Sequence, residues 1–474
     1  MLRPVTKVFQ IHPPFSSSSS NNWAVENTRM NQSLIGKTSP SPLTVTFEGV
    51  QQNCCVPPDV QLAAGPRYLM EMVNLDGAIY TKDGFLVREF GLEQFFSPNK
   101  TASFSSYPGD SMSDPVLKYD SQSGRWFASI SDTTQHSIRV AISQTGDPTG
   151  IWKIYNFPFG SQPDNCSDQP FIGASKDKIV ITVNNWANNC NWYSDNLPPE
   201  FRGVQFTIAN KSNLIAGSNV VESTQSESDL NYFSLHPAET LGNVSTLLIT
   251  TVGDFDHKNL QVLSIDGPLC NLYIRLVSFV IQTSHVPPDG IQPTEKSYPT
   301  TVSTLQTVST GDSRVQSAIW YHGTVWLAFN DACFVNNDNK SRSCIRLIQL
   351  NTNTSNIGQD LDVAALGSSL YYPALSVDKL GNLGIIFGYS SYYRNPSLLI
   401  SKHLSTDSPD SIEQPHILKL GTANELSDRY GDYFAASPDP SDRSAIWIAG
   451  QYHRLTTWST YIGQLHTSGT LTCK

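Results

Sequence analysis

Charged residues are scarce in this chain of 474 residues: Asp, Glu, Lys and Arg make up only 15% of it, against about a quarter of a typical globular protein. Basic residues are fewer than acidic ones: the chain has 31 Lys and Arg and 41 Asp and Glu, which gives a net charge of -10. No basic stripe exists to neutralise a phosphate backbone, so we expect no nucleic-acid partner. The abundant Gly, Asn, Ser and Thr suit the turns of a β-rich extracellular protein.

Long apolar runs are also missing. The best stretch, residues 272–281, is interrupted by Arg275, and a membrane-spanning helix needs roughly 18 apolar residues or more. We therefore expect no membrane span. Residues 1–12 mix lysine and arginine with isolated apolar residues and contain no continuous hydrophobic region of a signal peptide. For an exported protein, that signal would be absent from this chain.

The motifs of several enzyme and metal classes are absent: the sequence has no CxxC pair, no zinc-type Cys/His cluster, no GxSxG and no HExxH. The eight cysteines instead favour disulfides and an oxidising, extracellular or cell-surface location. Two pairs bracket loops, and we expect them to bond; for the other four, Cys473 and Cys270 are each candidates to pair with Cys54 or Cys55. The bracketing pairs are Cys166 with Cys190 and Cys333 with Cys344.

Helical periodicity is almost absent, and one sequence pattern, which we call the phrase, recurs at intervals of 54 to 81 residues. Each copy has a polar opening residue, a short buried strand, a tight turn and a second apolar strand that stops at polar residues. A repeat of this length leaves room for two outer strands, which makes one propeller blade. Six copies open at Asp59, Asp114, Asp168, Asn231, Asp312 and Asp432, and one more begins at Tyr371.

The sequence therefore predicts an all-β fold, a seven-bladed β-propeller of four-stranded antiparallel blades. It would occupy residues 45–474 as one domain, after a low-complexity lead-in, residues 1–44, that we expect to be flexible. Terminal strands at 44–49 and 458–465 are available to close the ring, which would otherwise leave exposed sheet edges. The longest interval leaves open an eighth blade around residues 272–281, or an insertion.

In any propeller, the innermost strands start on the face to which the second strands return. The opening aspartates should therefore ring one mouth of the central channel, inside a wider ring formed by Asn74, Asp132, Asn184, Asp254, Asn330 and Asp331. Two interpretations stay open: carboxylates that satisfy backbone N–H groups at blade junctions, or a pocket for a polar ligand or a cation such as Ca²⁺. Candidate ligand-binding residues are Asp59, Asp114, Asp168, Asp312, Arg314 and Asp432, of which Asp114, Asp168 and Asp432 are candidate catalytic residues.

Aromatic residues occur in loops that leave the second strands. Beside Asp and Asn they could stack on sugar rings, or they could pack as lids over disulfides. The candidates for glycan binding are Trp186, Trp192 and Tyr393.

The phrases resemble a group of secreted β-propellers that falls loosely within the sialidase-like superfamily. The resemblance covers roughly residues 50–466 and is carried by Gly311-Asp-Ser-Arg314, Tyr430-Gly-Asp-Tyr-Phe434 and residues 57–66, 113–116, 372–377 and 458–463. Sialidases combine an arginine triad, a Tyr/Glu nucleophile pair and Asp-box turns. This chain has no Asp box, and among its opening strands only Arg314 is a well-placed arginine, with Arg429 just outside. The resemblance thus implies the fold more than the sialidase reaction.

The function favoured by the sequence is an extracellular binding module that holds a glycan or protein at a cell surface on the Asp/Asn-lined face. The first alternative is a glycan-active enzyme, a hydrolase or lyase, that uses the carboxylates of the mouth; the second is a structural envelope component. An enzyme should show two or three mouth carboxylates with raised pKa in one pocket. A binding module should show a shallow face with exposed aromatic residues.

Overall fold

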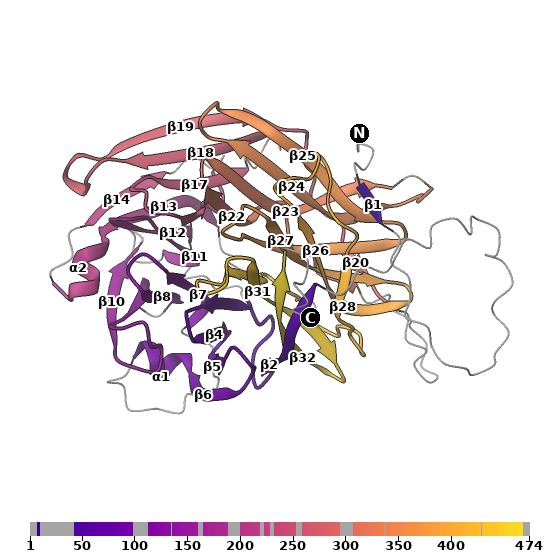
Figure 1. Cartoon of the computed structure of the whole chain (residues 1–474), viewed down its shortest axis with the longest axis horizontal. Coiled ribbons are helices and arrows are strands. Elements are labelled where there is room, and N and C mark those ends of the chain that lie inside the picture. The colour runs from indigo at the N-terminus through magenta and orange to yellow at the C-terminus, as the bar shows by residue number, and fades with distance from the viewer. Residues whose placement is uncertain are drawn as a thin grey trace, which may run out of the picture.

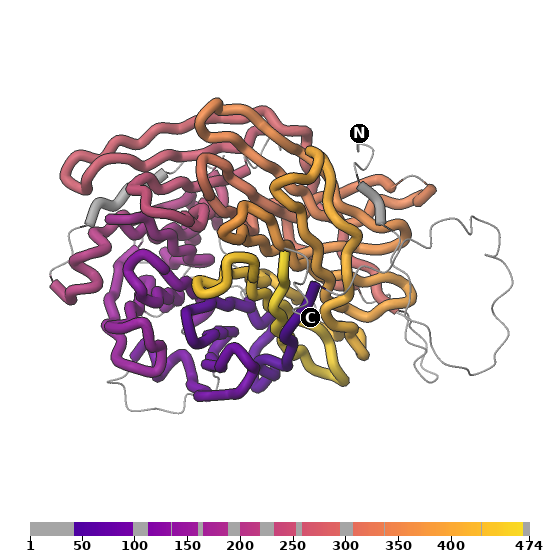
Figure 2. The backbone as a smooth tube through the Cα atoms, viewed as in Figure 1, coloured from indigo at the N-terminus to yellow at the C-terminus, as the bar shows by residue number. Residues whose placement is uncertain are grey.

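The computed structural model describes residues 7–9, 42–97, 112–133, 135–159, 165–187, 200–218, 222–227, 232–252, 258–293, 307–335, 337–427 and 429–467. These residues form a seven-bladed β-propeller. The chain runs around the ring in order, from indigo to yellow in Figure 2. None of the helices in this described part has the length and apolar character that a membrane span requires.

The first four blades follow the predicted pattern, in which each strand pairs antiparallel with the next. Blade 1 contains β3 (Gln61–Ala64), β4 (Tyr68–Val73), β5 (Asp76–Thr81) and β6 (Leu86–Gly91). Blade 2 contains β7 (Met112–Asp120), β8 (Arg125–Asp132), β9 (Ser137–Ser143) and β10 (Trp152–Pro158). Blade 3 contains β11 (Cys166–Ala174), β12 (Lys178–Trp186), β13 (Phe201–Asn210) and β14 (Glu222–Glu227). Blade 4 contains β15 (His236–Pro237), β17 (Leu247–Val252), β18 (Asn259–Asp266) and β19 (Tyr273–Val280).

Blade 5 gains a short parallel strand at each edge, which makes a six-stranded sheet. Its own strands are β22 (Val315–Tyr321), β23 (Thr324–Phe334), β24 (Ser341–Asn351) and β25 (Asn356–Ala365). The additions are β16 (Glu239–Leu241) on β22 and β1 (Lys7–Phe9) on β25. Blade 6 contains β26 (Ser368–Val377), β27 (Leu383–Ser391), β28 (Arg394–His403) and β29 (His416–Lys419).

Blade 7 closes the ring. Its inner strands are β30 (Ala435–Pro438), β31 (Ala445–Arg454) and β32 (Thr457–His466), and its outer strand is β2 (Leu43–Gln51), which comes from the other end of the chain. In Figure 1 the indigo β2 lies beside the yellow β32. These are the two terminal strands that the sequence predicted to close the ring, and they pair with each other. Residues 272–281 do not form an eighth blade, because they are mostly β19, the outer strand of blade 4.

The remaining elements are short. They are α1 (Leu92–Phe96), α2 (Lys211–Ala216), the 3₁₀ turn Leu269–Asn271, and a hairpin of β20 (Gly290–Ile291) and β21 (Thr307–Val308). The hairpin belongs to the insertion between blades 4 and 5, whose residues 281–293 we call the strap. The strap crosses to blades 6 and 7, where the Ile291 N–H donates to Ser369 and the Gln292 side chain donates to the Glu425 carbonyl.

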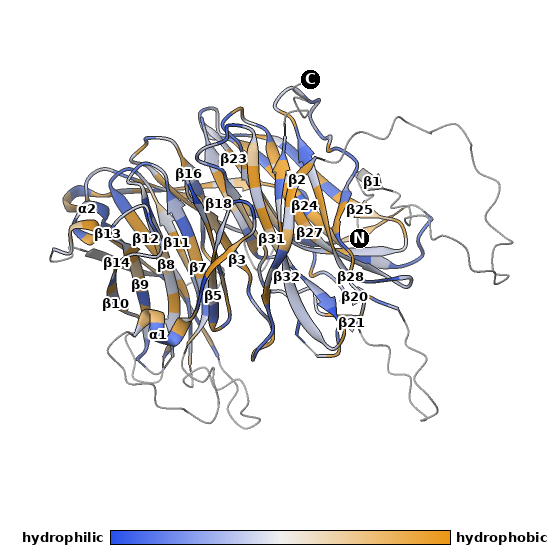
Figure 3. Cartoon of the chain, turned by 60° about the horizontal axis from the view of Figure 1, so that its bottom comes forward, coloured by the Kyte–Doolittle hydropathy of each residue, from blue (hydrophilic) through white to orange (hydrophobic). Residues whose placement is uncertain are grey.

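The core lies between neighbouring blades, in layers of apolar side chains. Figure 3 shows the hydrophobic stretches along the strands and the hydrophilic residues toward the strand ends. One layer joins the first blade to the last through Val60, Trp447 and Trp458. Because both faces of a blade are covered, the second strands read as continuous apolar runs rather than alternating ones. That pattern is what made the repeat visible in the sequence.

One carboxyl is buried at the seam that closes the ring. Glu71 of β4 accepts a hydrogen bond from the Val50 N–H of β2 at 3.0 Å and one from the Tyr80 hydroxyl at 3.4 Å. A Cβ at Gly49 would collide with this carboxyl. Burial raises the pKa of Glu71 to about 7 from an ordinary value of 4.5. The closed ring therefore holds the proton of Glu71 more tightly than the unfolded chain does.

This proton makes stability depend on pH. Between pH 4.5 and about 7 the unfolded chain binds fewer protons than the folded one, so the free energy of unfolding falls as pH rises. We expect a loss of up to about 3 kcal/mol across this interval, and the Glu71→Gln variant should lack it. Urea unfolding at a series of pH values measures both proteins. Parallel pH curves for the two would contradict a buried, protonated Glu71.

Candidate functional site

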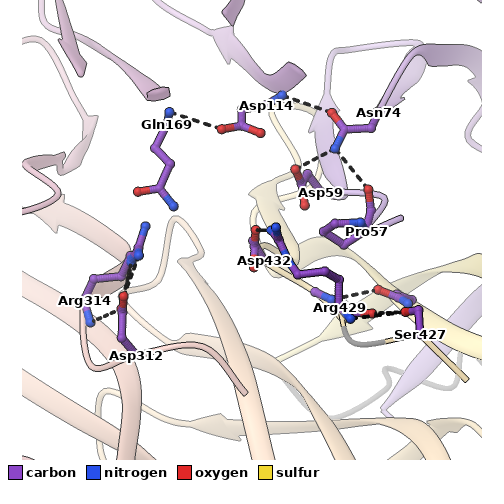
Figure 4. Close-up of polar contacts among 12 residues, drawn as sticks. Pro57, Asp59, Asn74, Asp114, Gln169, Asp312, Arg314, Ser427, Arg429 and Asp432 are labelled. Atoms are coloured by element: carbon purple, nitrogen blue, oxygen red, sulfur yellow. Dashed lines mark hydrogen bonds and ion pairs between the residues drawn. The ribbon is translucent and has the colours of Figure 1, made fainter. Parts of the chain in front are cut away.

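The residues that open the innermost strands meet at one mouth of the central channel, as Figure 4 shows. These residues belong to different blades, and their charged side chains interact electrostatically with one another across the blades. Six of the sequence-predicted ligand residues are brought together here; whether they bind a ligand remains a prediction. We call the group the mouth cluster: Asp59, Asp114, Asp168, Asp312, Arg314, Arg429 and Asp432.

A change of backbone direction at the start of each inner strand aims these side chains into the mouth. The pairing register shifts at this point in β7, β11 and β26, as in a β-bulge, and bulges re-aim side chains beside functional sites. Every blade also has one residue of positive φ here. These are Asp59 (52°), Asp114 (55°), Gln169 (50°), Ser234 (52°), Gly311 (65°), Tyr372 (52°) and Gly431 (94°). Non-glycine residues rarely adopt this conformation, and those that do cluster at functional sites.

The asparagines that end the second strands hold neighbouring blades together. In each case the side-chain Oδ1 of the asparagine accepts a backbone N–H of the next blade. The pairs are Asn74 with Asp114 at 3.0 Å, Asn184 with Ser234 at 2.9 Å, and Asn330 with Tyr372 at 2.7 Å. In each case the donor is the positive-φ residue of the next blade. Asp114 makes the same contact, because its carboxylate accepts the N–H of Gln169 in blade 3. The blade-junction role considered for the opening aspartates is therefore filled by Asp114 and by these asparagines. Asp254 and Asn231, which the sequence placed in the two rings, lie outside the described residues.

Three aspartates form a row across blades 1 to 3. Asp114 lies between the other two and interacts electrostatically with both Asp59 and Asp168. It also accepts the Gln169 N–H at 3.1 Å, while Asn74 donates to Asp59 at 2.7 Å. Because neighbouring negative charges disfavour one another, the charge of Asp114 raises the pKa of both Asp59 and Asp168.

Burial is the main cause of the raised pKa values in this row. Burial raises the pKa of Asp59 well above its usual range, and the charges of Asp432 and Asp114 raise it further. Burial also raises the pKa of Asp168, with the Asp114 charge as the next cause. Asp59 is only 1% exposed, and its Oδ1 has no hydrogen-bond partner. Asp168, in contrast, is partly exposed at the mouth.

Two arginines complete the cluster, and each is paired with an aspartate. Arg314 Nε lies 2.7 and 2.9 Å from the two Asp312 oxygens, and its Nη2 also pairs with Asp312. Although burial disfavours the charge on Asp312, Arg314 outweighs burial and lowers the pKa of that carboxyl. Arg429 Nη2 lies 2.6 Å from Asp432 Oδ2. The sequence placed Arg429 just outside the opening strands, and the structure brings it into the mouth.

Asp432 and its neighbour Tyr433 occupy the blade 7 side of the mouth. Burial raises the pKa of Asp432, although Arg429 and Arg314 oppose the rise. The Tyr433 hydroxyl is buried without a hydrogen-bond partner and interacts electrostatically with Asp114, Arg314 and Asp432. Sequence reasoning missed Tyr433. Its place directly after Asp432 in the Gly-Asp-Tyr phrase was the available signal.

Below the mouth the channel narrows to a cavity of about 40 Å³ that all seven inner edges line. Tyr433 and Phe171 line the cavity and pack against each other. Lys118 and Glu239 also line it and form an ion pair at 3.1 Å. The mouth cluster thus lies at one end of this narrow channel.

Aromatic residues lie on the blade 3 and blade 4 side of the mouth. The Arg314 guanidinium stands 4.7 Å over the Phe233 ring, Phe233 packs on Phe201, and Phe201 packs on Trp186. The predicted Trp186 therefore joins the site through two other rings. Tyr393 instead lies in the β27–β28 turn with its side chain 89% exposed, apart from the mouth cluster. Trp192 lies outside the described residues.

The disulfides partly follow expectation. Cys333 and Cys344 bond as predicted, and Cys166 is disulfide-bonded, although Cys190 lies outside the described residues. The expectation that Cys54 and Cys55 pair with Cys473 and Cys270 is wrong for the described residues. Cys54 bonds to its neighbour Cys55, and Cys270 is free and exposed. Ring closure made long-range pairing plausible, but two adjacent thiols already lie within reach of each other.

Calcium at the mouth remains a prediction. Among the described residues, the groups of three or more ligand atoms within 4.8 Å of one another comprise only Cys333, Cys344 and Asp362, and these two cysteines are already bonded to each other. The mouth carboxylates would have to draw together to bind a metal ion.

Fold and site together define a seven-bladed propeller with a cluster of aspartates and two arginines at one end of its channel. No protein-family model and no curated protein matches the chain significantly. Solved structures with a similar trace include a Dyadobacter fermentans protein of unknown function, with 8% identity, a TM-score of 0.42, and coverage of 90% of this chain and 98% of that one.

Two further structures have similar traces. A Trypanosoma rangeli sialidase bound to the inhibitor DANA has 9% identity, a TM-score of 0.38, and coverage of 89% and 60%. The WD40 domain of SCAP from fission yeast has 9% identity, a TM-score of 0.37, and coverage of 89% and 98%. These likenesses are too distant to carry a functional argument, so function must be argued from the mouth itself.

Proposed function

We propose that this protein is a glycan-active enzyme that binds its substrate in the mouth and cleaves it with acid catalysis. The observation that carries the proposal is the row Asp59–Asp114–Asp168, in which burial and the charge of Asp114 raise the pKa of the two outer carboxyls. A carboxyl that keeps its proton near neutral pH is what protonation of a leaving oxygen requires. The raised pKa of three mouth carboxyls supports this choice over a binding module.

The residues differ in the roles they could take. Asp168 is partly exposed and can reach a bound substrate, so it is the general acid. The buried Asp59 has a raised pKa and holds its proton behind Asp114. Asp432 supplies the second carboxylate that glycoside hydrolysis needs. Its ionised form is favoured by Arg429 and Arg314. The edge formed by Phe233, Phe201 and Trp186 offers apolar faces beside these polar groups, where a sugar ring can stack.

A second candidate is glycan or protein binding without turnover. Tyr392 and Tyr393 favour it, because both rings project from the β27–β28 turn and Tyr393 is almost fully exposed. For either function we propose a location outside the cell, as the Cys333–Cys344 disulfide suggests.

A glycan panel scored for both binding and release of reducing ends tests the proposal. The wild-type protein should bind and cleave at least one glycan, and Asp114→Asn, Asp168→Asn and Asp432→Asn should each lose turnover. Asp147→Asn is the control, because Asp147 lies in an exposed turn between β9 and β10 on the opposite face. If the wild-type protein binds a glycan without turnover, the catalytic proposal is wrong and the protein is a binding module. If it neither binds nor cleaves any glycan, both proposals for glycans are wrong.

A further inference from the structure

We propose that a pocket between blades 4 and 5 is a second ligand site, which binds one neutral hexose ring on the face of the propeller opposite the mouth. The inference goes beyond the proposed function and does not depend on it, because no residue of the mouth cluster lines this pocket. It depends on the place and size of the pocket, on its apolar surface, and on polar side chains whose charges balance.

The pocket lies between the outer parts of the two blades. Its walls are β17, β18 and β19 of blade 4, Trp320 near the end of β22, and the β24–β25 turn of blade 5. Because β22 is an inner strand and starts at the mouth, Trp320 lies toward the opposite face. The pocket has a volume of about 220 Å³, whereas pockets for drug-sized ligands enclose about 300–1,000 Å³. It therefore suits one small ring rather than a chain of sugars.

Part of the lining is apolar. Leu248, Val262 and Phe279 line the pocket, and each is at most 8% exposed. Trp320 also lines it, and its indole N–H is buried without a hydrogen-bond partner among the described residues. Buried polar atoms are nearly always paired, so this donor indicates a missing acceptor. A hexose ring offers both groups that this surface lacks: a face of C–H groups for the apolar side chains and hydroxyl oxygens for the indole.

The polar part of the lining offers acceptors and donors together. The Thr246 and Ser264 hydroxyls both donate to Asp266, so toward a ligand these two oxygens act as acceptors. Arg275 and the Asn353 amide are exposed and supply donors. Among the described residues that line the pocket, only Asp266 and Arg275 are charged, and their charges balance. A neutral ligand whose groups both donate and accept, as hydroxyls do, matches this set.

Nuclear magnetic resonance of the full chain, labelled with nitrogen-15 at tryptophan, tests the proposal inside the pocket. The chain has nine tryptophans, and the indole signal that disappears in Trp320→Phe belongs to Trp320. D-Glucose, D-galactose, D-mannose and N-acetylglucosamine are the probes. At least one should shift the Trp320 signal with a Kd of about 1 mM, the affinity of a few net hydrogen bonds and one apolar face. Sorbitol, which has similar hydroxyls but no ring, should bind about tenfold weaker.

Two exposed residues provide variants that carry little risk to the fold. Arg275→Gln and Asn353→Ala should each weaken hexose binding about threefold to tenfold, the effect of one hydrogen bond. Arg67→Gln is the matched control, because Arg67 is an exposed arginine in the β3–β4 turn of blade 1, and it should leave binding unchanged. Asp114→Asn should also leave it unchanged, because Asp114 lies at the mouth.

Each contrary result overturns a stated part of the proposal. If no hexose shifts the Trp320 signal at about a hundred times the expected Kd, where a site is saturated, the second site is wrong. If sorbitol, or the zwitterion L-leucine, binds as tightly as the best hexose, the assignment to a sugar ring is wrong. If Asp114→Asn abolishes the shift, the effect arises at the mouth and the second site is again wrong. Turnover at the mouth is scored separately, so these results leave the proposed function unaffected.

Discussion

Replacement of Arg346 by methionine is expected to lower the free energy of unfolding by about 3–5 kcal/mol, the cost of breaking a buried ion pair. Arg346 lies in β24, and its side chain is fully buried among three carboxylates. It contacts Asp360 at 2.5 Å, Asp362 at 2.9 Å and Asp331 at 3.7 Å. Methionine fills similar space but leaves this group of carboxylates without its central positive charge.

Urea or guanidinium unfolding measures the loss, with Lys419→Met as the control. Lys419 pairs with Glu48 at the surface, where about a quarter of the lysine side chain is exposed, and such pairs contribute about 1 kcal/mol or less. The Arg346→Met deficit should shrink in acid, because protonation removes the negative charges left behind. A deficit no larger than that of Lys419→Met would contradict the assignment of Arg346 as the charge that holds this group together.

The same group of charges fixes one end of the strap. Arg346 Nη2 donates to the Gln282 carbonyl at 2.7 Å, and the Gln282 N–H donates to Asp360 at 2.8 Å. At its other end, the strap bonds reciprocally with Glu425, because the Glu425 N–H donates back to the Gln292 side chain. The loop that begins at Glu425 carries Arg429 into the mouth. Stability in blade 5 and geometry at the mouth are therefore linked through one segment.

The sequence predicted the architecture well because the propeller repeats one local pattern. A strand buried on both faces between two polar ends is visible without any tertiary information, and seven copies of it require a closed ring. The topology also placed Asp59, Asp114, Asp168 and Asp432 at one mouth, since inner strands all start on the same face. The eighth-blade alternative arose because the interval between the fourth and fifth copies is the longest. The structure fills this interval with β19, the exposed outer strand of blade 4, and with the insertion that contains the strap.

The chemistry of the mouth could not be predicted in the same way. Whether Asp114 raises the pKa of Asp59 and Asp168 depends on burial and on distances of a few tenths of an ångström. The pairing of Arg314 with Asp312, only two residues away, depends on the rotamers of both side chains. The repeat pattern also does not predict how Cys54 and Cys55 pair, because their disulfide is local and belongs to a single blade junction.

Asp114→Asn is expected to reduce turnover by about a hundredfold to ten-thousandfold, the range for loss of acid–base catalysis, while glycan binding persists. After burial, the charge of Asp114 is a cause of the raised pKa of both Asp59 and Asp168. The substitution removes a negative charge that raises the pKa of both neighbours, and the new amide can donate a hydrogen bond to their ionised forms. Both pKa values should therefore fall.

Carbon-13 NMR of the aspartate carboxyls measures this fall directly, without a substrate. In the wild-type protein two carboxyl resonances should titrate well above the usual range, and in Asp114→Asn both should titrate at lower pH. Because the acid must be protonated to act, turnover that remains should be lost at a lower pH than in the wild type. Unchanged titration of both carboxyls in a folded Asp114→Asn protein would show that Asp114 does not raise the pKa of its neighbours, and its assigned role in acid catalysis would be wrong.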